Sequence, residues 1–109
     1  MTEQRVIWDQ LGSDINGEAA NNKSGYSVSL SSDGKIVAVG APYNNNTYPS
    51  SGHVKVYKYN DVSWNQMGAD IDGKATSEQS GFSLSLSSDG TIVAIGSPEQ
   101  DGNATNWSQ

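Results

Sequence analysis

The stretch Ser24-Gly-Tyr-Ser-Val-Ser-Leu-Ser-Ser-Asp-Gly-Lys-Ile-Val-Ala-Val-Gly-Ala-Pro42 returns as Ser80-Gly-Phe-Ser-Leu-Ser-Leu-Ser-Ser-Asp-Gly-Thr-Ile-Val-Ala-Ile-Gly-Ser-Pro98. Aligned without a gap at an offset of 56 residues, the segments Trp8–Pro42 and Trp64–Pro98 share 21 identities in 35 positions. Repetition with a period of this order is typical of solenoids and propellers, in which one unit needs neighbours to bury its apolar face. The chain is therefore expected to contain two copies of one structural unit.

Each copy begins with a predicted β-hairpin. Tyr26, Val28 and Leu30 alternate with serines, so one face of this strand is apolar and the other is polar. The Asp33-Gly34 pair is expected to supply the positive-φ residues of a tight turn. The returning strand, Lys35–Ala41, is apolar on both faces and is predicted to be buried on both sides.

Further strands are predicted outside the hairpins. Gly52–Tyr59 alternates again, and Arg5–Gly12 and Trp64–Gly68 share a Trp-x-Gln spacing that indicates equivalent strands. The connections 13–23 and 70–79 are expected to be loops. The chain would then start with an unpaired fourth strand and end with an unpaired hairpin.

We predict an all-β fold of the β-propeller type, built from four-stranded antiparallel blades with about two blades per chain. Residues 1–109 are taken as a single repeat unit of a propeller, with repeat one at about 8–63 and an incomplete repeat two at about 64–109. The polar end of the chain, 99–109, closes with Trp107-Ser-Gln109, which repeats the Trp-x-Gln spacing and indicates either a fourth strand with the third one deleted or a chance match. In an assembled ring this segment could instead lie where the third strand is missing.

Composition narrows the choice of partners. Hydrophobic residues make up 34% of the chain and mean hydropathy is −0.59, while turn-forming residues are abundant, as in turn-rich β-proteins. Six basic and twelve acidic residues give a net charge of −6, which argues against a nucleic-acid partner. No apolar run approaches the roughly 18 residues of a membrane span. Met1–Ile7 lacks the basic start and apolar core of a signal peptide.

The repeat resembles the FG-GAP repeat of integrin-alpha-type β-propellers. The residues that carry the resemblance open the hairpin, close it and form the third strand: Gly25-Tyr26 and Gly81-Phe82, Gly40-Ala-Pro42 and Gly96-Ser-Pro98, and Gly52-x-Val-x-Val-Tyr57. The resemblance implies blades that pack face to face around a central channel, and an extracellular or cell-surface location. FG-GAP repeats often carry a calcium loop in the hairpin connection. Here that connection holds one carboxylate, too few for the six or more oxygens that calcium takes.

A second calcium hypothesis rests on the predicted loops. Asp14-Ile-Asn-Gly17 and Asp70-Ile-Asp-Gly73 resemble the opening of a calcium loop, which makes Asp14, Asp70 and Asp72 the calcium candidates. A later bidentate Glu is missing at the required spacing. The alternative interpretation is that these aspartates cap turns, and no cofactor is expected in that case.

A few side chains bear on whether the chain could be an enzyme or could bind glycans. His53, the only histidine, is expected at the surface, and no His, Cys or carboxylate set has catalytic spacing, so no catalytic residue is assigned and the chain is predicted not to be an enzyme. Aromatic residues offer either a sugar-stacking platform or packing between blades: Trp8, Trp64, Tyr43, Tyr48, Tyr57 and Tyr59.

The sequence favours a non-catalytic binding, adhesion or structural interaction module with a glycan or protein ligand. A calcium-dependent or glycan-binding, lectin-like propeller is the alternative, and an enzyme domain is less favoured. Two blades cannot close a ring, so we expect a homo-oligomer, preferably a trimer with six blades. In that ring Arg5–Gly12 of one chain would complete the hairpin Gly81–Pro98 of the next by strand exchange. The competing interpretation is a fragment of a longer multi-blade chain.

Overall fold

The computed structural model describes residues 8–45, 48–98 and 107–108. These residues form eight β-strands and no helix, and the strands are arranged in two antiparallel sheets. The predicted all-β class is therefore confirmed for the described part of the chain. Within that part, no helix is long and apolar enough to cross a membrane.

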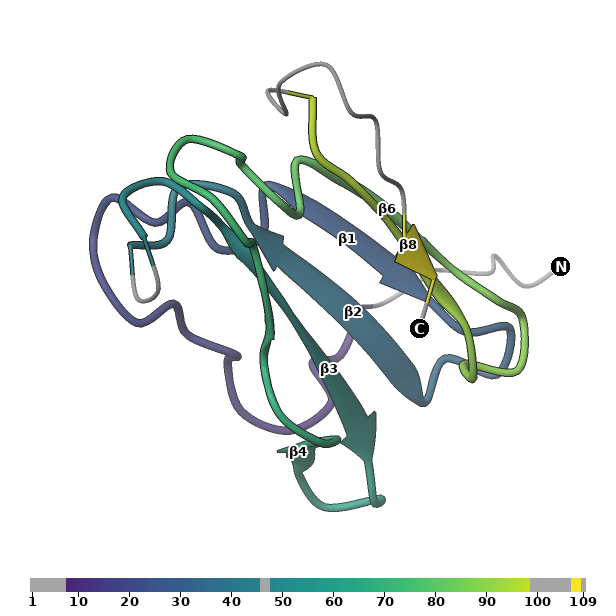
Figure 1. Cartoon of the computed structure of the whole chain (residues 1–109). Coiled ribbons are helices and arrows are strands. Elements are labelled where there is room, and N and C mark those ends of the chain that lie inside the picture. Colours follow the sequence, from purple (N-terminus) through teal and green to yellow (C-terminus); the bar gives the residue numbers. More distant parts are fainter. Residues whose placement is uncertain (1–7, 46–47, 99–106, 109) are drawn as a thin grey trace, which may run out of the picture.

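The larger sheet, the repeat-one sheet, contains four strands in the order β1-β2-β3-β4, with a fifth beside the start of β3 (Figure 1). The bounds of these strands are β1 Ser27–Leu30, β2 Ile36–Ala41, β3 His53–Tyr59, β4 Trp64–Gln66 and β5 Ile71–Asp72. The strand β4 pairs with the end of β3, and β5 pairs with the start of β3. The hairpin and the third strand were predicted correctly, whereas β5 lies in a segment that was expected to be loop.

The smaller sheet, the repeat-two sheet, has the order β6-β7-β8, with β6 at Ser83–Leu86, β7 at Val93–Gly96 and β8 at Trp107–Ser108. The β6–β7 register pairs Ser83 with Gly96, as the β1–β2 register pairs Ser27 with Gly40, so the two hairpins are equivalent at the 56-residue offset. The strand β8 pairs with β7 as β3 pairs with β2. The end of the chain thus takes the place of the third strand and not that of the fourth.

Both hairpin turns use one positive-φ residue where two were expected. Gly34 has a φ of 76° and Gly90 has the same value, but the preceding aspartates do not enter this region. Asp33 instead accepts hydrogen bonds from the Ser31 hydroxyl, at 2.7 Å, and from the Lys35 backbone N–H, at 3.0 Å. The aspartate therefore acts as an acceptor that closes the turn.

The strand expected at Arg5–Gly12 is not found. Residues 8–12 form no strand, and residues 5–7 lie outside the described part of the chain. A strand needs a partner: the equivalent segment, β4, pairs with β3, and no strand of the described residues pairs with residues 8–12. Leu11 instead contacts β4, where its carbonyl accepts a hydrogen bond from the Trp64 indole N–H at 2.9 Å.

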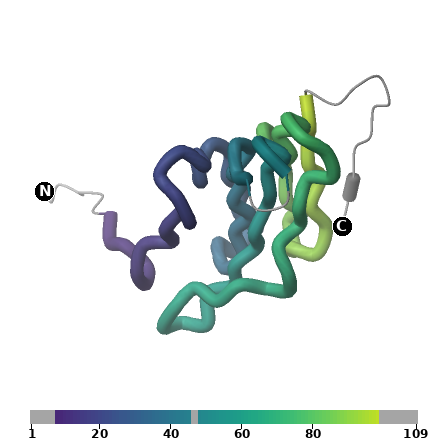
Figure 2. Tube along the Cα trace, turned by 60° about the vertical axis from the view of Figure 1, so that its left-hand side comes forward, coloured from purple at the N-terminus to yellow at the C-terminus, as the bar shows by residue number. Residues whose placement is uncertain are grey.

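The hydrophobic core lies between the two sheets. Its most buried side chains are Ala38 and Val54 from the repeat-one sheet and Val93 and Ile95 from the repeat-two sheet, each at most 4% exposed. Figure 2 shows the green and yellow-green repeat-two segment on one side of the blue and teal sheet, and the purple N-terminal segment on the other. The repeat-one sheet thus forms the middle layer.

Candidate functional site

Each hairpin has one apolar face and one face of small residues. The apolar faces are Val28, Leu30, Val37 and Val39 in repeat one, and Leu84, Leu86, Val93 and Ile95 in repeat two. The small-residue faces are Ser27, Ser29, Ala38 and Gly40 in repeat one, and Ser83, Ser85, Ala94 and Gly96 in repeat two. Within the chain, the small-residue face of repeat one packs against the apolar face of repeat two.

Hydrogen bonds fix the register of this contact. The Ser27 hydroxyl donates to the Gly81 carbonyl at 2.7 Å, and the Ser29 hydroxyl oxygen accepts from the Leu86 backbone N–H at 3.0 Å. A β-carbon on Gly40 would overlap the Gly81 backbone, so this position has room for glycine alone. The two repeats are therefore held at close backbone distance.

The other two faces are open for the most part, although the N-terminal segment covers the repeat-one face beside Val39. Val28 and Leu30 on the apolar face of repeat one are 61% and 57% exposed, and this face borders an open groove of about 540 Å³ that reaches Ile15 and Trp64. On the opposite side of the molecule, Ser85 and Ala94 on the small-residue face of repeat two are exposed beside a shallow hollow of about 300 Å³. One open face is apolar and the other is its small-residue counterpart.

A charged cluster lies at the start of β3. His53 and Asp72 are direct partners in the β3–β5 ladder, so their side chains project from the same face of the sheet. Lys55 lies two residues after His53 in β3, and Asp70 lies two residues before Asp72 of β5. Because side chains in extended chain alternate between the two faces, Lys55 and Asp70 project from that face as well. The fifth strand therefore assembles a histidine, two aspartates and a lysine.

The His53 side chain is 5% exposed, which contradicts the expected surface position. Its Nδ1 atom is buried without a hydrogen-bond partner, and the nearest carboxylate oxygen of Asp70 is 3.7 Å away, beyond hydrogen-bonding distance. Burial lowers the pKa of His53, against the opposing effect of the carboxylates of Asp70, Glu18 and Asp72. Burial therefore favours the neutral form of the imidazole.

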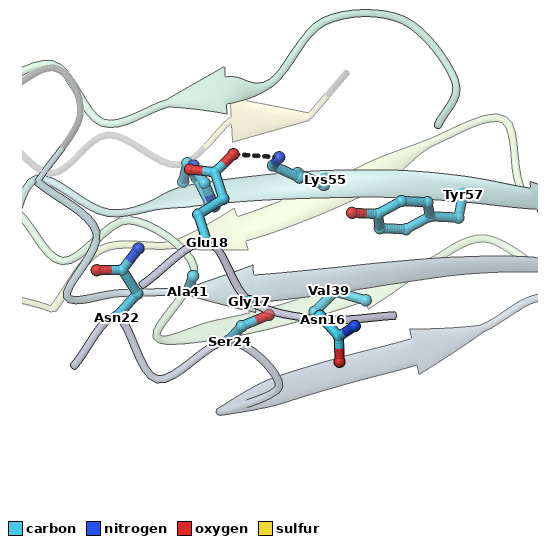
Figure 3. Close-up of a pocket in the computed structure, with 10 residues that line it drawn as sticks. Asn16, Gly17, Glu18, Asn22, Ser24, Val39, Ala41, Lys55 and Tyr57 are labelled. Atoms are coloured by element: carbon cyan, nitrogen blue, oxygen red, sulfur yellow. Dashed lines mark hydrogen bonds and ion pairs between the residues drawn. The ribbon is translucent and has the colours of Figure 1, made fainter. Parts of the chain in front are cut away.

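The ammonium of Lys55 bonds to the carboxylate of Glu18, and this hydrogen bond raises the pKa of Lys55 (Figure 3). Asp70 faces Lys55 at 3.7 Å and accepts a hydrogen bond from the Gln66 amide at 2.6 Å, both through Oδ1. The second oxygen, Oδ2, is the one that faces His53. Gln66 thus orients this carboxylate toward the histidine.

A small cavity of about 10 Å³, room for roughly one water molecule, lies under the connection that precedes β1. Figure 3 shows Glu18 and Lys55 meeting above it, with the Tyr57 ring alongside. Its lining residues are Asn16, Gly17, Glu18, Asn22, Ser24, Val39, Ala41, His53, Lys55 and Tyr57. The cavity joins the charged cluster to the N-terminal segment.

The structure separates the three calcium candidates. Asp70 and Asp72 each have an oxygen within 4.8 Å of a His53 ring nitrogen, and these two oxygens also lie within 4.8 Å of each other. Asp14 instead lines the open groove and accepts a hydrogen bond from the Gln10 amide at 2.8 Å. The Gln10–Asp14 pair is the repeat equivalent of Gln66–Asp70.

Sequence reasoning missed His53 as a member of the cluster. The available signal was the alternation of polar residues in Gly52-His-Val-Lys-Val-Tyr57, which puts His53, Lys55 and Tyr57 on one face. What the alternation does not reveal is that β5 pairs beside this face and that Glu18 lies against Lys55. Both contacts depend on chain segments that are distant in sequence.

The aromatic candidates are divided between separate contacts. The rings of Tyr59 and Trp64 lie 5.0 Å apart at the β3–β4 edge, and Tyr43 instead contacts Tyr26, at 6.4 Å. Trp8 is 90% exposed, so the packing role expected for the repeated tryptophan does not hold there.

No known protein family, no curated protein and no solved structure matches this chain.

Proposed function

We propose that this chain is a non-catalytic, propeller-type interaction module whose two repeats are consecutive blades and whose copies stack head to tail into a ring. One observation carries the proposal: the two open faces are the repeat equivalents of the two faces that pack on each other within the chain. The open apolar face of one copy would be covered by the open small-residue face of a second copy. A heterologous contact of this kind closes into a ring when the rotation fits.

The residues of the two open faces support the formation, between two copies, of the same contact that joins the repeats within one chain. The small-residue faces are identical in both repeats, and the apolar faces differ only by exchanges among valine, leucine and isoleucine. By equivalence, the Ser83 hydroxyl would donate to the Gly25 carbonyl of the next copy, as Ser27 donates to Gly81 within the chain. The new contact would therefore bury apolar surface and satisfy the same polar groups.

Propellers have about four to eight blades, so a ring of two-blade chains contains two to four copies, and we choose the trimer with six blades. The segment Trp8–Gly12 lies beside the open apolar face and is the repeat equivalent of β4. In the ring this segment would leave its contact with Trp64 and add to the neighbouring blade outside β8. The exposed Trp8 would then gain the kind of packing that Trp64 has against Tyr59.

A ring of this kind is a scaffold whose outer loops offer contacts to a protein ligand. A glycan site would need several aromatic rings at one place. Here the rings take part in separate contacts, which favours a protein over a glycan as the ligand. Its acidic character, with a net charge of −6, suits a basic protein surface better than nucleic acid.

The test is the mass of the untagged chain by light scattering. We expect three times 11.5 kDa for the wild type. Ser85→Arg places a charge on the open small-residue face and should give a folded monomer. The control, Val62→Arg, adds the same charge to a 76% exposed position in the β3–β4 turn and should keep the mass of the trimer. A folded wild-type monomer at every concentration would overturn the proposal.

A further inference from the structure

The charged cluster at the start of β3 contains a polar atom whose position the fold alone does not explain. His53 Nδ1 is buried without a hydrogen-bond partner, in a side chain that is 5% exposed. Native proteins pair nearly all of their buried polar atoms, so this nitrogen is open to a partner that the chain itself does not supply. Asp70 Oδ2 lies 3.7 Å from this nitrogen, and Asp72 offers an oxygen within 4.8 Å of a His53 ring nitrogen.

The spacing of these atoms suits a single metal ion. His53 Nδ1 and Asp70 Oδ2 are 3.7 Å apart, which is too long for a hydrogen bond and fits two ligands that each lie about 2.0–2.2 Å from one ion. Asp72 offers an oxygen within 4.8 Å of one His53 ring nitrogen and of one Asp70 carboxylate oxygen. The β3–β5 ladder holds His53 opposite Asp72, so the backbone presets this geometry.

The electrostatics of the cluster also favour a cation. The cluster holds three carboxylates, from Glu18, Asp70 and Asp72, and one ammonium, from Lys55, which pairs with Glu18 and Asp70. Lys55 is bonded to Glu18, and Gln66 donates to Asp70 Oδ1, so the oxygen that faces His53 is left for a metal. A hydrogen-bonded partner that orients a ligating carboxylate in this way is a common second layer of metal sites.

We propose that His53, Asp70 and Asp72 bind one divalent transition-metal ion, with zinc the best match to one imidazole nitrogen and two carboxylate oxygens. Calcium takes oxygen ligands alone and six or more of them, so the imidazole redirects the earlier calcium hypothesis toward a borderline metal. All three ligands come from one chain, and the site is therefore independent of ring assembly. A bound ion would tie β5, the start of the second repeat, to β3 of the first.

The experiment titrates zinc chloride into the untagged chain, after treatment with a chelator, by calorimetry. We expect one zinc ion per chain and a melting temperature that rises with zinc concentration, because the ion binds the folded state alone. Asp72→Asn should weaken binding by more than about 100-fold, and Gln66→Ala by about 10- to 100-fold, the usual effect of losing an outer partner. The control is Asp14→Asn, which removes the same charge from the repeat-one equivalent of Asp70 and should bind zinc like the wild type.

A second measurement identifies the ligand atom. His53 is the only histidine, so its two ring nitrogens give unambiguous NMR signals. We expect zinc to shift the Nδ1 resonance most strongly in the wild type and in Asp14→Asn. The proposal is overturned if the wild type binds no zinc, if Asp72→Asn binds it unchanged while circular dichroism shows a native fold, or if Nδ1 does not respond.

Discussion

The two repeats have nearly the same sequence and opposite burial. Val93 on the apolar face of repeat two is 4% exposed, whereas the equivalent Val37 is only half-buried. On the small-residue faces the order is reversed, because Ala38 is fully buried and Ala94 is exposed. Neighbours therefore decide which face of each repeat is buried.

The largest expected difference between the repeats concerns the two equivalent glycines. Gly40→Ala should destabilise the fold by about 2–3 kcal/mol, because the new β-carbon would overlap the Gly81 backbone between the repeats. Gly96→Ala meets only the Ser83 hydroxyl, which can rotate, so folding stability should change by less than about 1 kcal/mol. Urea denaturation in the Ser85→Arg background measures both free energies of unfolding, so that assembly contributes to neither value.

Light scattering on the same two variants sharpens the comparison. In the proposed ring, the Gly25 backbone of the next copy lies against Gly96 as Gly81 lies against Gly40, so Gly96→Ala should be folded but monomeric. Equal losses of folding stability in the two variants would show that the glycines do not differ in their neighbours. A Gly96→Ala variant that keeps the wild-type mass would argue against the proposed contact.

An intermediate effect on folding stability is expected for two valines at equivalent positions of the two repeats. Val93→Ala should cost about 2 kcal/mol, because it leaves a cavity in the core, whereas Val37→Ala should cost less than about 1 kcal/mol. Both are best measured by denaturation in the Ser85→Arg background, so that assembly contributes to neither value. Equal costs would mean that the apolar face of repeat one is covered within the monomer.

Much of the hairpin architecture could be predicted because it is local. The alternation in Ser24–Pro42 and the Asp-Gly turn depend on residues close in sequence, and β1, β2 and their repeat equivalents follow from them. The fate of Trp8–Gly12 could not be predicted, because a strand depends on a partner that the segment itself does not supply. The burial of His53 depends in the same way on β5, which pairs from 17 or more residues away.

The smallest effect concerns the hairpin turns. The hydroxyl of Ser31 lowers the pKa of Asp33, and the hydroxyl of Thr91, followed by that of Ser87, lowers the pKa of Asp89. A lowered carboxyl pKa contributes stability that is present above the pKa of the unfolded chain and is lost as pH falls through the lowered value. Thr91→Val should raise the pKa of Asp89 toward its ordinary value and leave that of Asp33 unchanged, as carboxyl NMR titration can measure. A parallel rise at Asp33 would show that the two turns do not titrate independently.

Disulfide trapping tests the complementarity of the two open faces most directly. The chain contains no cysteine, so introduced pairs react without background. The Ser29 hydroxyl lies 3.0 Å from the Leu86 backbone within the chain, and the equivalent pair between copies is Ser85 with Leu30. Under mild oxidation, Ser29→Cys with Leu86→Cys should give an internally bridged monomer.

Ser85→Cys with Leu30→Cys should give, under the same conditions, covalent oligomers up to the trimer on a non-reducing gel. A reducing agent should return these oligomers to the monomer. If the second pair stays monomeric while the first pair closes, the head-to-tail stacking of the repeats is contradicted.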